Sequence, residues 1–390
     1  MDRQHLLQPR YVDALNNLGA PRSLERLATP ALVCDVDLLE ANITRMATTT
    51  ASAGVALRPH VKSHKTTYVA KLQLEAGAAG LAFAKLSEAE AVIWQLRSDG
   101  YQEPVSALLT SPLVGVATAQ RALALAAHCD LMVVADHPDA VDELGNAARD
   151  AGVTLSVICD VDVGLGRTGV ASPDQAVDVV ERIASTPSLF FAGVQGYGGQ
   201  LQHIAGRDER CSATTMSTML LTAVIDALEA KGFTVTLRTG GGTGTALIDS
   251  ELGVLNELQC GSYVFMDREY RDALASDPEG AFHQSLTIAT TVISANQQGF
   301  VTVDAGLKSM ATDTGSPVVV GYEELSKYSF FGDEQGLITM PPGNSWRRGD
   351  RIDLVPPHCD PTVDRYDVLW LVRGDVVVGV EDVVARGCSQ

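Results

Sequence analysis

Short runs of apolar residues alternate with longer amphipathic segments through most of the chain, from about residue 55 to residue 264. This alternation is typical of βα units, in which parallel strands are joined by helices that cover the sheet. Eight apolar runs predict strands, at residues 55–62, 80–85, 104–109, 131–136, 154–160, 191–197, 234–239 and 257–264. The segments between them predict helices, including those at residues 66–74, 87–96, 116–127, 138–151, 173–184 and 212–231.

Eight strands joined by helices fit a (β/α)8 TIM barrel, which needs about 200 residues or more. A doubly wound open sheet is the alternative arrangement of the same units. We favour the barrel because the strand count is eight and because the glycine-rich turns fall late in the series, where barrels often bind phosphate. The predicted fold class is therefore α/β.

The pattern changes after about residue 280, where short strands with tight turns replace the βα rhythm. These strands are predicted at residues 286–293, 300–303, 317–320, 350–355, 368–372 and 375–384. They indicate a smaller, mostly antiparallel β domain. We divide the chain into an N-terminal arm at residues 1–28 that packs with the β domain, a barrel unit at residues 29–280, and a C-terminal β domain at residues 281–390.

Two further segments precede the barrel rhythm. A strand at residues 30–36 is followed by an amphipathic helix at residues 37–53. We assign this strand to the β domain or to the junction, so that the barrel begins with the strand at residues 55–62. The arm itself carries a short helical pattern at residues 11–18.

Composition narrows the class of protein. The chain has 390 residues, of which 46% are hydrophobic and 20% charged, as expected for a globular protein with a large core. The net charge of −19 and the lack of a basic tract argue against a nucleic-acid partner or an anionic membrane surface. No apolar run approaches the roughly 20 residues of a membrane span. The N-terminal sequence lacks the apolar region of a signal peptide, so we expect a cytoplasmic protein, and seven dispersed cysteines indicate reduced thiols.

A basic stretch follows the first predicted barrel strand, with the sequence Leu57-Arg58-Pro59-His60-Val61-Lys62-Ser63-His64-Lys65-Thr66. Lys62 is the leading candidate for chemistry, because a lysine amine forms a Schiff base with a carbonyl cofactor when desolvation or nearby cations lower its pKa. Arg58, His60, His64 and Lys65 are the candidate cations. The alternative is a basic strand end that binds an anion or faces water.

Glycine-rich segments follow the last two predicted barrel strands. Residues 240–245 read Gly-Gly-Gly-Thr-Gly-Thr, and residues 259–263 read Gln-Cys-Gly-Ser-Tyr. Glycines let the backbone approach an anion closely, and free N–H groups supply donors to it. Neither segment has the Gly-Lys-Ser/Thr ending of a nucleoside-triphosphate loop. These positions predict a phosphate site, and a plain tight turn is the alternative.

Two further polar side chains fall at strand ends. Arg167 lies in the turn after the fifth predicted strand and could reach a phenolate or a carboxylate, or form a structural salt bridge. Tyr197 ends the sixth strand between Gly196 and Gly198, where it could line a site or pack in the core. Because active sites of barrels lie at the C-terminal ends of the strands, both are candidate site residues.

The β domain contributes a possible metal motif, His358-Cys359-Asp360. In an extended segment residues i and i+2 point to one face, so His358 and Asp360 would converge while Cys359 points away. One imidazole and one carboxylate make half of a divalent-cation site, and this nitrogen and oxygen set favours Mn²⁺ or Mg²⁺ over Zn²⁺. The alternative is an ordinary surface turn.

Together these motifs resemble the fold-type III pyridoxal-phosphate enzymes, and specifically the D-threonine aldolase / D-serine dehydratase family. The resemblance runs from residue 29 to the C-terminus and rests on eight ordered motifs, at residues 58–65, 85–90, 162–169, 193–197, 240–245, 257–267, 304–308 and 358–360. It implies an alanine-racemase-like fold, a head-to-tail homodimer and pyridoxal 5′-phosphate (PLP) joined to Lys62. It also implies that Arg167 lies near the cofactor O3′, that Tyr197 lines the pocket, and that the phosphate is surrounded by Gly241, Gly242, Thr243, Gly261, Ser262 and Tyr263.

The metal motif separates two branches of this family. Dehydratase-type members resemble His-x-Cys, whereas aldolase-type members, including those cleaving 3-hydroxy-D-aspartate, resemble His-x-Asp, which matches Asp360 here. The resemblance therefore implies PLP- and metal-dependent retro-aldol cleavage of D-β-hydroxy-α-amino acids to glycine and an aldehyde. Gly198 and Gln335 depart from the family pattern, and the group that accepts the hydroxyl proton stays open, with His60 a candidate. The alternatives are a dehydratase that yields a keto acid and ammonia, an amino-acid racemase, and a non-catalytic PLP-binding protein.

Overall fold

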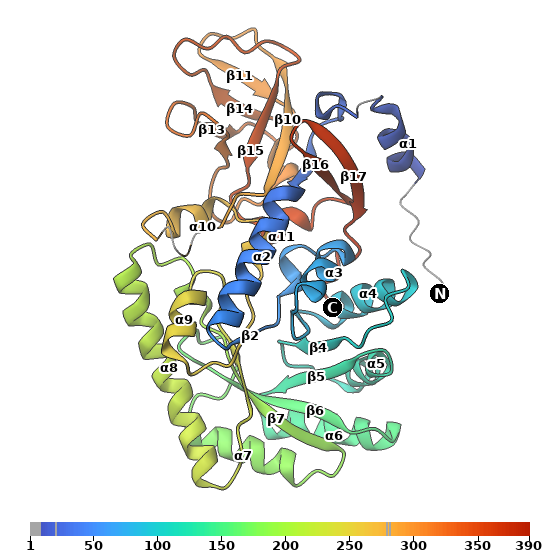
Figure 1. The fold of residues 1–390 in the computed structure, drawn as a ribbon, viewed down its shortest axis with the longest axis vertical. Coiled ribbons are helices and arrows are strands. Elements are labelled where there is room, and N and C mark those ends of the chain that lie inside the picture. Colours follow the sequence, from blue (N-terminus) through green and yellow to red (C-terminus); the bar gives the residue numbers. More distant parts are fainter. Residues whose placement is uncertain (1–8, 20–21, 278–279, 281) are drawn as a thin grey trace.

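The computed structural model describes residues 9–19, 22–277, 280 and 282–390. Figure 1 shows two bodies, a barrel built from the middle of the chain and a β domain built mainly from its C-terminal part. The long helix α2 (Val36–Ser52) lies along the boundary between them. Residues 1–8 and 20–21 of the predicted arm lie outside the described residues.

The barrel is an eight-stranded parallel sheet. Its order is β2-β9-β8-β7-β6-β5-β4-β3, so β2 and β3 are the two ends of the ladder. Backbone N–H groups of Ala79 and Ala82 donate to the carbonyls of Leu57 and Pro59, at 2.7 and 2.9 Å, and join those ends. The strands are β2 (Ala56–Leu57), β3 (Leu81–Phe83), β4 (Ser106–Leu109), β5 (Asp130–Ala135), β6 (Leu155–Val161), β7 (Leu189–Gly196), β8 (Leu237–Gly240) and β9 (Glu257–Leu258). The predicted (β/α)8 barrel is confirmed, and the open sheet is not formed.

Helices cover the outside of this sheet, close to the predicted positions. Standard capping sets their ends: His137 and Ser172 cap α6 and α7, each of which then begins with a proline, and Gly152 closes α6 with φ 70°. The helices are α3 (Thr67–Glu75), α4 (Leu86–Ser98), α5 (Val116–Ala126), α6 (Pro138–Ala151), α7 (Pro173–Ala184), α8 (Arg207–Ala230), α9 (Ala246–Leu252) and α10 (Arg268–Ala273). Local sequence signals therefore predict where most of the barrel helices begin and end.

The β domain contains a nine-stranded sheet whose main path is β13-β14-β11-β10-β1-β16-β17. The N-terminal strand β1 (Ala31–Asp35) lies at its centre, antiparallel to β10 and parallel to β16. The remaining strands are β10 (Leu286–Ser294), β11 (Phe300–Val303), β12 (Val318–Val319), β13 (Tyr328–Phe330), β14 (Gly336–Thr339), β15 (Arg351–Val355), β16 (Val368–Arg373) and β17 (Val376–Asp382). The short strands β13 and β14 were not predicted.

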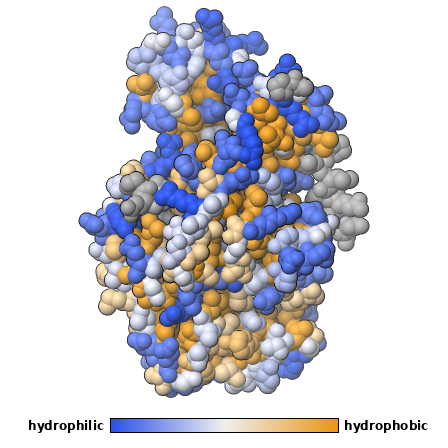
Figure 2. Space-filling view, viewed as in Figure 1, coloured by the Kyte–Doolittle hydropathy of each residue, from blue (hydrophilic) through white to orange (hydrophobic). Residues whose placement is uncertain are grey.

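The helix of the N-terminal arm, α1 (Pro9–Asn17), lies against β17 at the outer edge of this sheet. Tyr11 packs edge-on to Trp370 with ring centroids 6.4 Å apart, and its hydroxyl donates to Asp367. Apolar surface remains over the β16–β17 hairpin in Figure 2, where Val376 and Val378 are exposed.

Among the described residues, one helix, α8, reaches the length and hydropathy of a membrane span by composition alone. In the structure it packs against α7 and α9 as a barrel helix. Leu221, Val224 and Leu228 are its buried apolar contacts with the barrel.

Gly193 lies at a very close strand contact in the barrel. The register of β6 and β7 shifts just before it, which gives a β-bulge, and its φ is 151°. A Cβ at this position would lie 2.0 Å from the carbonyl oxygen of Leu237 in β8. We expect Gly193→Ala to lower the free energy of unfolding by about 3 kcal/mol or more, measured by denaturant titration. Gly379→Ala in β17 is the matched control, because its Cβ would meet nothing closer than 3.5 Å; equal losses in the two variants would contradict the prediction.

Candidate cofactor site

Lys62 lies at the C-terminal end of β2, on a 3-10 turn formed by Val61–Ser63. The strand predicted over residues 55–62 is wrong in its second half, because β2 ends at Leu57. His60 caps the turn: its Nδ1 accepts from the backbone N–H of Lys62 at 3.4 Å. This turn, rather than a long strand, therefore sets the backbone position from which the Lys62 side chain extends.

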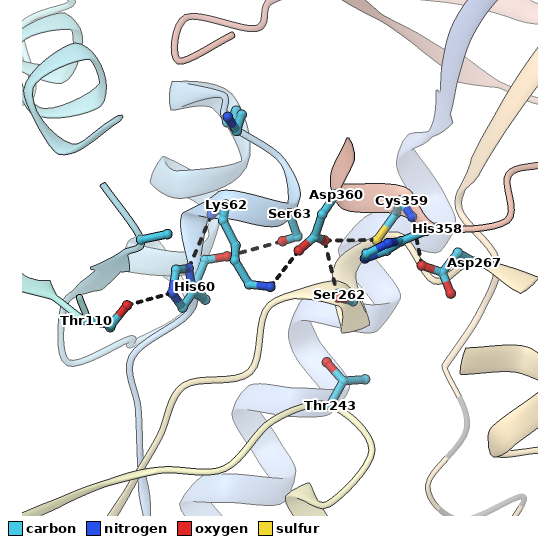
Figure 3. Close-up of polar contacts among 12 residues, drawn as sticks. His60, Lys62, Ser63, Thr110, Thr243, Ser262, Asp267, His358, Cys359 and Asp360 are labelled. Carbon is cyan, nitrogen blue, oxygen red and sulfur yellow. Dashed lines mark hydrogen bonds and ion pairs between the residues drawn. The ribbon is translucent and has the colours of Figure 1, made fainter. Parts of the chain in front are cut away.

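The side chain of Lys62 reaches across the boundary to the β domain. Its Nζ lies 2.7 Å from Oδ2 of Asp360, and the side chain of Lys62 is 39% exposed while that of Asp360 is 13% exposed. The nearby Asp360 carboxylate raises the pKa of Lys62 above its usual range. In turn Lys62 and His358 hold the pKa of Asp360 below its usual range, although burial opposes this. Figure 3 shows this pair joining the two domains.

The basic neighbours of Lys62 do not form a free cationic cluster. Arg58 donates to Glu257 at 2.8 Å, and Lys65 donates to Asp364 at 2.6 Å. Burial lowers the pKa of His60 to about 3 and the pKa of His64 to about 4, so both rings are neutral near pH 7. The expected pKa-lowering role of these residues is therefore wrong, because each has its own partner or is desolvated.

Both ring nitrogens of His60 are engaged. The Thr110 hydroxyl donates to the carbonyl of Phe83 at 3.1 Å, so it accepts from Nε2 of His60 at 3.2 Å. With Nδ1 accepting from Lys62, the neutral imidazole carries its proton on Nε2. This arrangement fixes the ring and the turn beneath Lys62.

The predicted phosphate residues meet at the C-terminal ends of β8 and β9. Within the described part of the chain, no protein acceptor receives the backbone N–H groups of Gly241, Thr243, Gly261 and Ser262, although all four residues are buried. Buried backbone donors are nearly always paired, so four unpaired ones in one place fit a bound anion. Figure 3 shows Ser262 below Asp360, with Thr243 on the adjacent loop.

Two of the six residues predicted to surround the phosphate make hydrogen bonds to the protein interior. The N–H of Gly242 donates to the Thr245 hydroxyl at 3.3 Å. The hydroxyl of Tyr263 accepts from Gln73 at 3.0 Å and its N–H donates to the hydroxyl of Thr243 at 3.1 Å. Tyr263 is fully buried, so it shapes the loop from behind.

Arg167 and Tyr197 form a neighbouring wall. The guanidinium carbon of Arg167 lies 5.5 Å from the centre of the Tyr197 ring, a cation–π arrangement. Both line a pocket with Asp160, Thr168 and Gln195, at the ends of β6 and β7. The structure thus places them together at the C-terminal face of the barrel.

The metal motif is not extended as predicted. Residues Cys359–Val363 form the short helix α11, and His358 caps it with an extended backbone. Asp360 therefore faces Lys62, whereas Nδ1 of His358 lies 2.7 Å from Asp313. Ser262 donates toward the other oxygen of Asp360 at 3.5 Å. Pro361 is compatible with the first turn of a helix, so it does not prevent the helix from starting at Cys359.

The donor set fits an open divalent-cation site. Asp313 accepts from Nδ1 of His358, and no hydrogen bond within the described residues uses Nε2, which leaves its lone pair available. Among those residues no group of three His, Cys, Asp or Glu side chains is arranged to hold a metal ion. Two protein ligands suit a catalytic cation that keeps positions for water and substrate, not a closed structural zinc site.

Several residues of the site were missed from the sequence. Thr110 follows β4, so its position at a strand end was the available signal. Asp313 had no sequence signal of its own, because its partner His358 lies 45 positions away in the sequence. Asp267 ends the motif at residues 257–267 but was given no role; its buried carboxylate accepts from the N–H of Cys359 at 2.8 Å and fixes the start of α11.

The buried carboxylate of Glu88, in the first turn of α4, predicts how the stability of the protein depends on pH. Burial raises its pKa to about 7, against the lowering effect of Lys65. Between about pH 4.5 and 7 the folded protein keeps a proton that the unfolded chain has released, so the unfolding free energy falls as pH rises. We expect this contribution of Glu88 to the unfolding free energy, on the order of 2 kcal/mol across the window, to disappear in Glu88→Gln. Denaturant titration at several pH values measures it, with the exposed Glu103→Gln as control; parallel wild-type and Glu88→Gln curves would refute it.

Comparison with known proteins places this site in a family. Residues 34–269 match the family described as alanine racemase, N-terminal domain, and residues 285–372 match a putative serine dehydratase domain. The chain is 35% identical to a D-threonine aldolase of an Arthrobacter species over 94% of this chain and 95% of that protein. It is 35% identical to a 3-hydroxy-D-aspartate aldolase of Paracoccus denitrificans, over 93% and 92%.

A solved structure agrees with the sequence matches. The D-threonine aldolase of Filomicrobium marinum superposes with a TM-score of 0.89 at 33% identity, covering 94% of this chain and 98% of that one. The two matched families span the barrel and the β domain, and the paired Lys62 and Asp360 come one from each. The chain therefore belongs to the PLP-dependent, alanine-racemase-like family of the D-threonine aldolases and D-serine dehydratases.

Proposed function

We propose that this enzyme cleaves D-β-hydroxy-α-amino acids of the D-threonine or 3-hydroxy-D-aspartate type to glycine and an aldehyde. The full-length similarity to relatives named D-threonine aldolase and 3-hydroxy-D-aspartate aldolase supports this carbon–carbon lyase activity. The observation that carries the proposal is the contact of 2.7 Å between Lys62 of the barrel and Asp360 of the β domain. It brings an amine and a possible metal ligand to one place.

The chain's own residues would hold PLP as follows. Lys62 would supply the amine, and Arg167 with Tyr197 would border the ring. The phosphate would be bound by the unpaired N–H groups of Gly241, Thr243, Gly261 and Ser262. Bound PLP supplies the electron-withdrawing ring that this bond cleavage requires. Gly241, Gly242 and Tyr263 complete the loop that surrounds the phosphate.

His358 and Asp360 would hold the divalent cation, for which Mn²⁺ or Mg²⁺ suits the nitrogen and oxygen donors better than Zn²⁺. Such a cation supplies Lewis acidity toward the substrate hydroxyl. Asp313 orients His358 by accepting from Nδ1. His60, whose two nitrogens are already bonded, orients the turn that carries Lys62.

A dehydratase is the second candidate, because the β domain matches a putative serine dehydratase domain. In that reaction Lys62 would remove the α-proton and the hydroxyl would leave, giving a keto acid and ammonia. Asp360, in place of a cysteine at that position, favours the aldolase.

Product identification separates these reactions. The holoenzyme is incubated with D-threonine, D-serine and 3-hydroxy-D-aspartate, with L-threonine as control, and glycine and ammonia are both quantified. We expect glycine from the D-substrates and its loss after chelation, restored by Mn²⁺ or Mg²⁺. Ammonia in place of glycine would establish the dehydratase, and full activity in chelator would remove the metal from the proposal.

We further propose that the chain forms a homodimer, as the family resemblance implies, and that it works in the cytoplasm. Sedimentation velocity tests the assembly: a species of twice the chain mass supports it, and a monomer at working concentration would contradict it. The net charge of −19 supports a small-molecule substrate rather than nucleic acid or an anionic membrane.

A further inference from the structure

We infer that Gln202, Thr245 and Asp249 form a positioning network that shapes the phosphate-binding loop at residues 241–245. This inference rests on the proposed PLP site. None of the three side chains needs to touch the cofactor, because they act on the backbone of the loop from behind.

Gln202 supplies the first set of contacts. It follows the 3-10 turn after β7 and is almost fully buried. Its Oε1 accepts from the N–H of Gly244 at 3.0 Å, and its Nε2 donates to the carbonyl of Gly198 at 3.0 Å and to the Thr245 hydroxyl at 3.1 Å. One side chain thus joins the end of β7 to two positions of the loop.

The Thr245 hydroxyl is the centre of the network. It accepts from Gln202 and from the N–H of Gly242, so its single proton is directed to Oδ2 of Asp249, at 2.6 Å. Asp249 is buried on α9, and its backbone N–H donates to the carbonyl of Thr245 at 2.8 Å. Each hydrogen bond of the Thr245 hydroxyl thus has one defined donor and one defined acceptor. A buried polar network that meets this condition can specify a single arrangement.

The network accounts for the glycines of the loop. A Cβ on Gly241 would lie 2.5 Å from Asp249, and one on Gly242 would lie 2.5 Å from the Gln202 side chain. A Cβ on Gly244 would lie 2.0 Å from the carbonyl oxygen of Gln202. The loop is therefore packed directly on Gln202 and Asp249.

The orientation of alternate N–H groups follows from this packing. Those of Gly242 and Gly244 are bonded inward, to Thr245 and Gln202. Those of Gly241 and Thr243 have no acceptor among the described residues. Without the inward hydrogen bonds, the peptide groups of the loop could rotate. The outward N–H donors would then no longer point in one fixed direction, which lowers the affinity for a phosphate specifically.

The experiment compares two ligands that differ only in the phosphate. Apoenzyme is titrated with PLP and with pyridoxal, and both dissociation constants are measured by absorbance. We expect Thr245→Val and Gln202→Leu to weaken PLP binding about tenfold or more, since each removes three hydrogen bonds. Pyridoxal affinity should change less than about twofold by the same reasoning, and Thr245→Ser should restore PLP binding because it keeps the hydroxyl.

The controls separate this inference from the proposed function. Thr222→Val on α8, which loses only a bond to the carbonyl of Thr218, should leave both affinities unchanged. Equal weakening of PLP and pyridoxal in the variants, or no weakening of either, would overturn the network while leaving the PLP site intact. Wild-type protein that binds PLP no better than pyridoxal would overturn both.

Discussion

Lys62→Ala is expected to lower turnover by on the order of 10³-fold or more, because it removes the amine that we propose is joined covalently to the cofactor. Borohydride reduction followed by peptide mapping should label Lys62 in the wild type and no residue in the variant. Lys71→Ala, which changes an exposed lysine on α3, should keep both activity and label.

The same substitution has a second expected effect. Asp360 would keep its buried carboxylate but lose its partner at 2.7 Å, which destabilises the contact between the two domains. The apoenzyme Tm should fall in Lys62→Ala. Substantial activity in the variant, or a label on another lysine of the wild type, would refute the assignment of the amine.

Asp360→Ala is expected to reduce turnover about 10²-fold or more while PLP still binds, because the change removes the proposed cation ligand. The phosphate loop loses only the long contact of 3.5 Å from Ser262 to this carboxylate. The absorbance of bound cofactor and the rate of glycine release measure the two effects separately. Asp178→Ala, an exposed carboxylate on α7, is the matched control.

Metal titration makes this prediction sharper. Wild-type activity should be lost with chelator and recover with Mn²⁺, whereas Asp360→Ala should recover only at much higher metal concentration. A variant that recovers activity at the same metal concentration as the wild type would show that Asp360 has no part in cation binding.

The barrel could be predicted because its signal is local and repeated. Each strand is a short apolar run, and helices such as α6 and α7 begin with a capping residue and a proline. The strands β13 and β14 escaped prediction because they are three and four residues long and lie among polar loops. Their pairing with each other and with β11 is what makes them strands.

The candidate site residues could be named from the sequence, but their electrostatics could not. Lys62 and Asp360 stood out by motif, yet their contact spans 298 positions in the sequence. The sign of the pKa shift of Lys62 depends on that contact, and the neutral state of His60 depends on burial. The direction of the N–H group of Gly244 in the loop at residues 241–245 depends on Gln202, which carries no motif.

The place of β1 in the middle of the β-domain sheet bears on how the protein is made. This strand leaves the ribosome first, but its partners β10 and β16 emerge more than 250 and 330 residues later. The barrel, which lies between these strands in the sequence, can fold during translation. The two edges of β1 stay unpaired until its partner strands have been synthesised. A fragment that begins at residue 281 lacks the central strand, and supplying residues 22–52 in trans should rescue its folding.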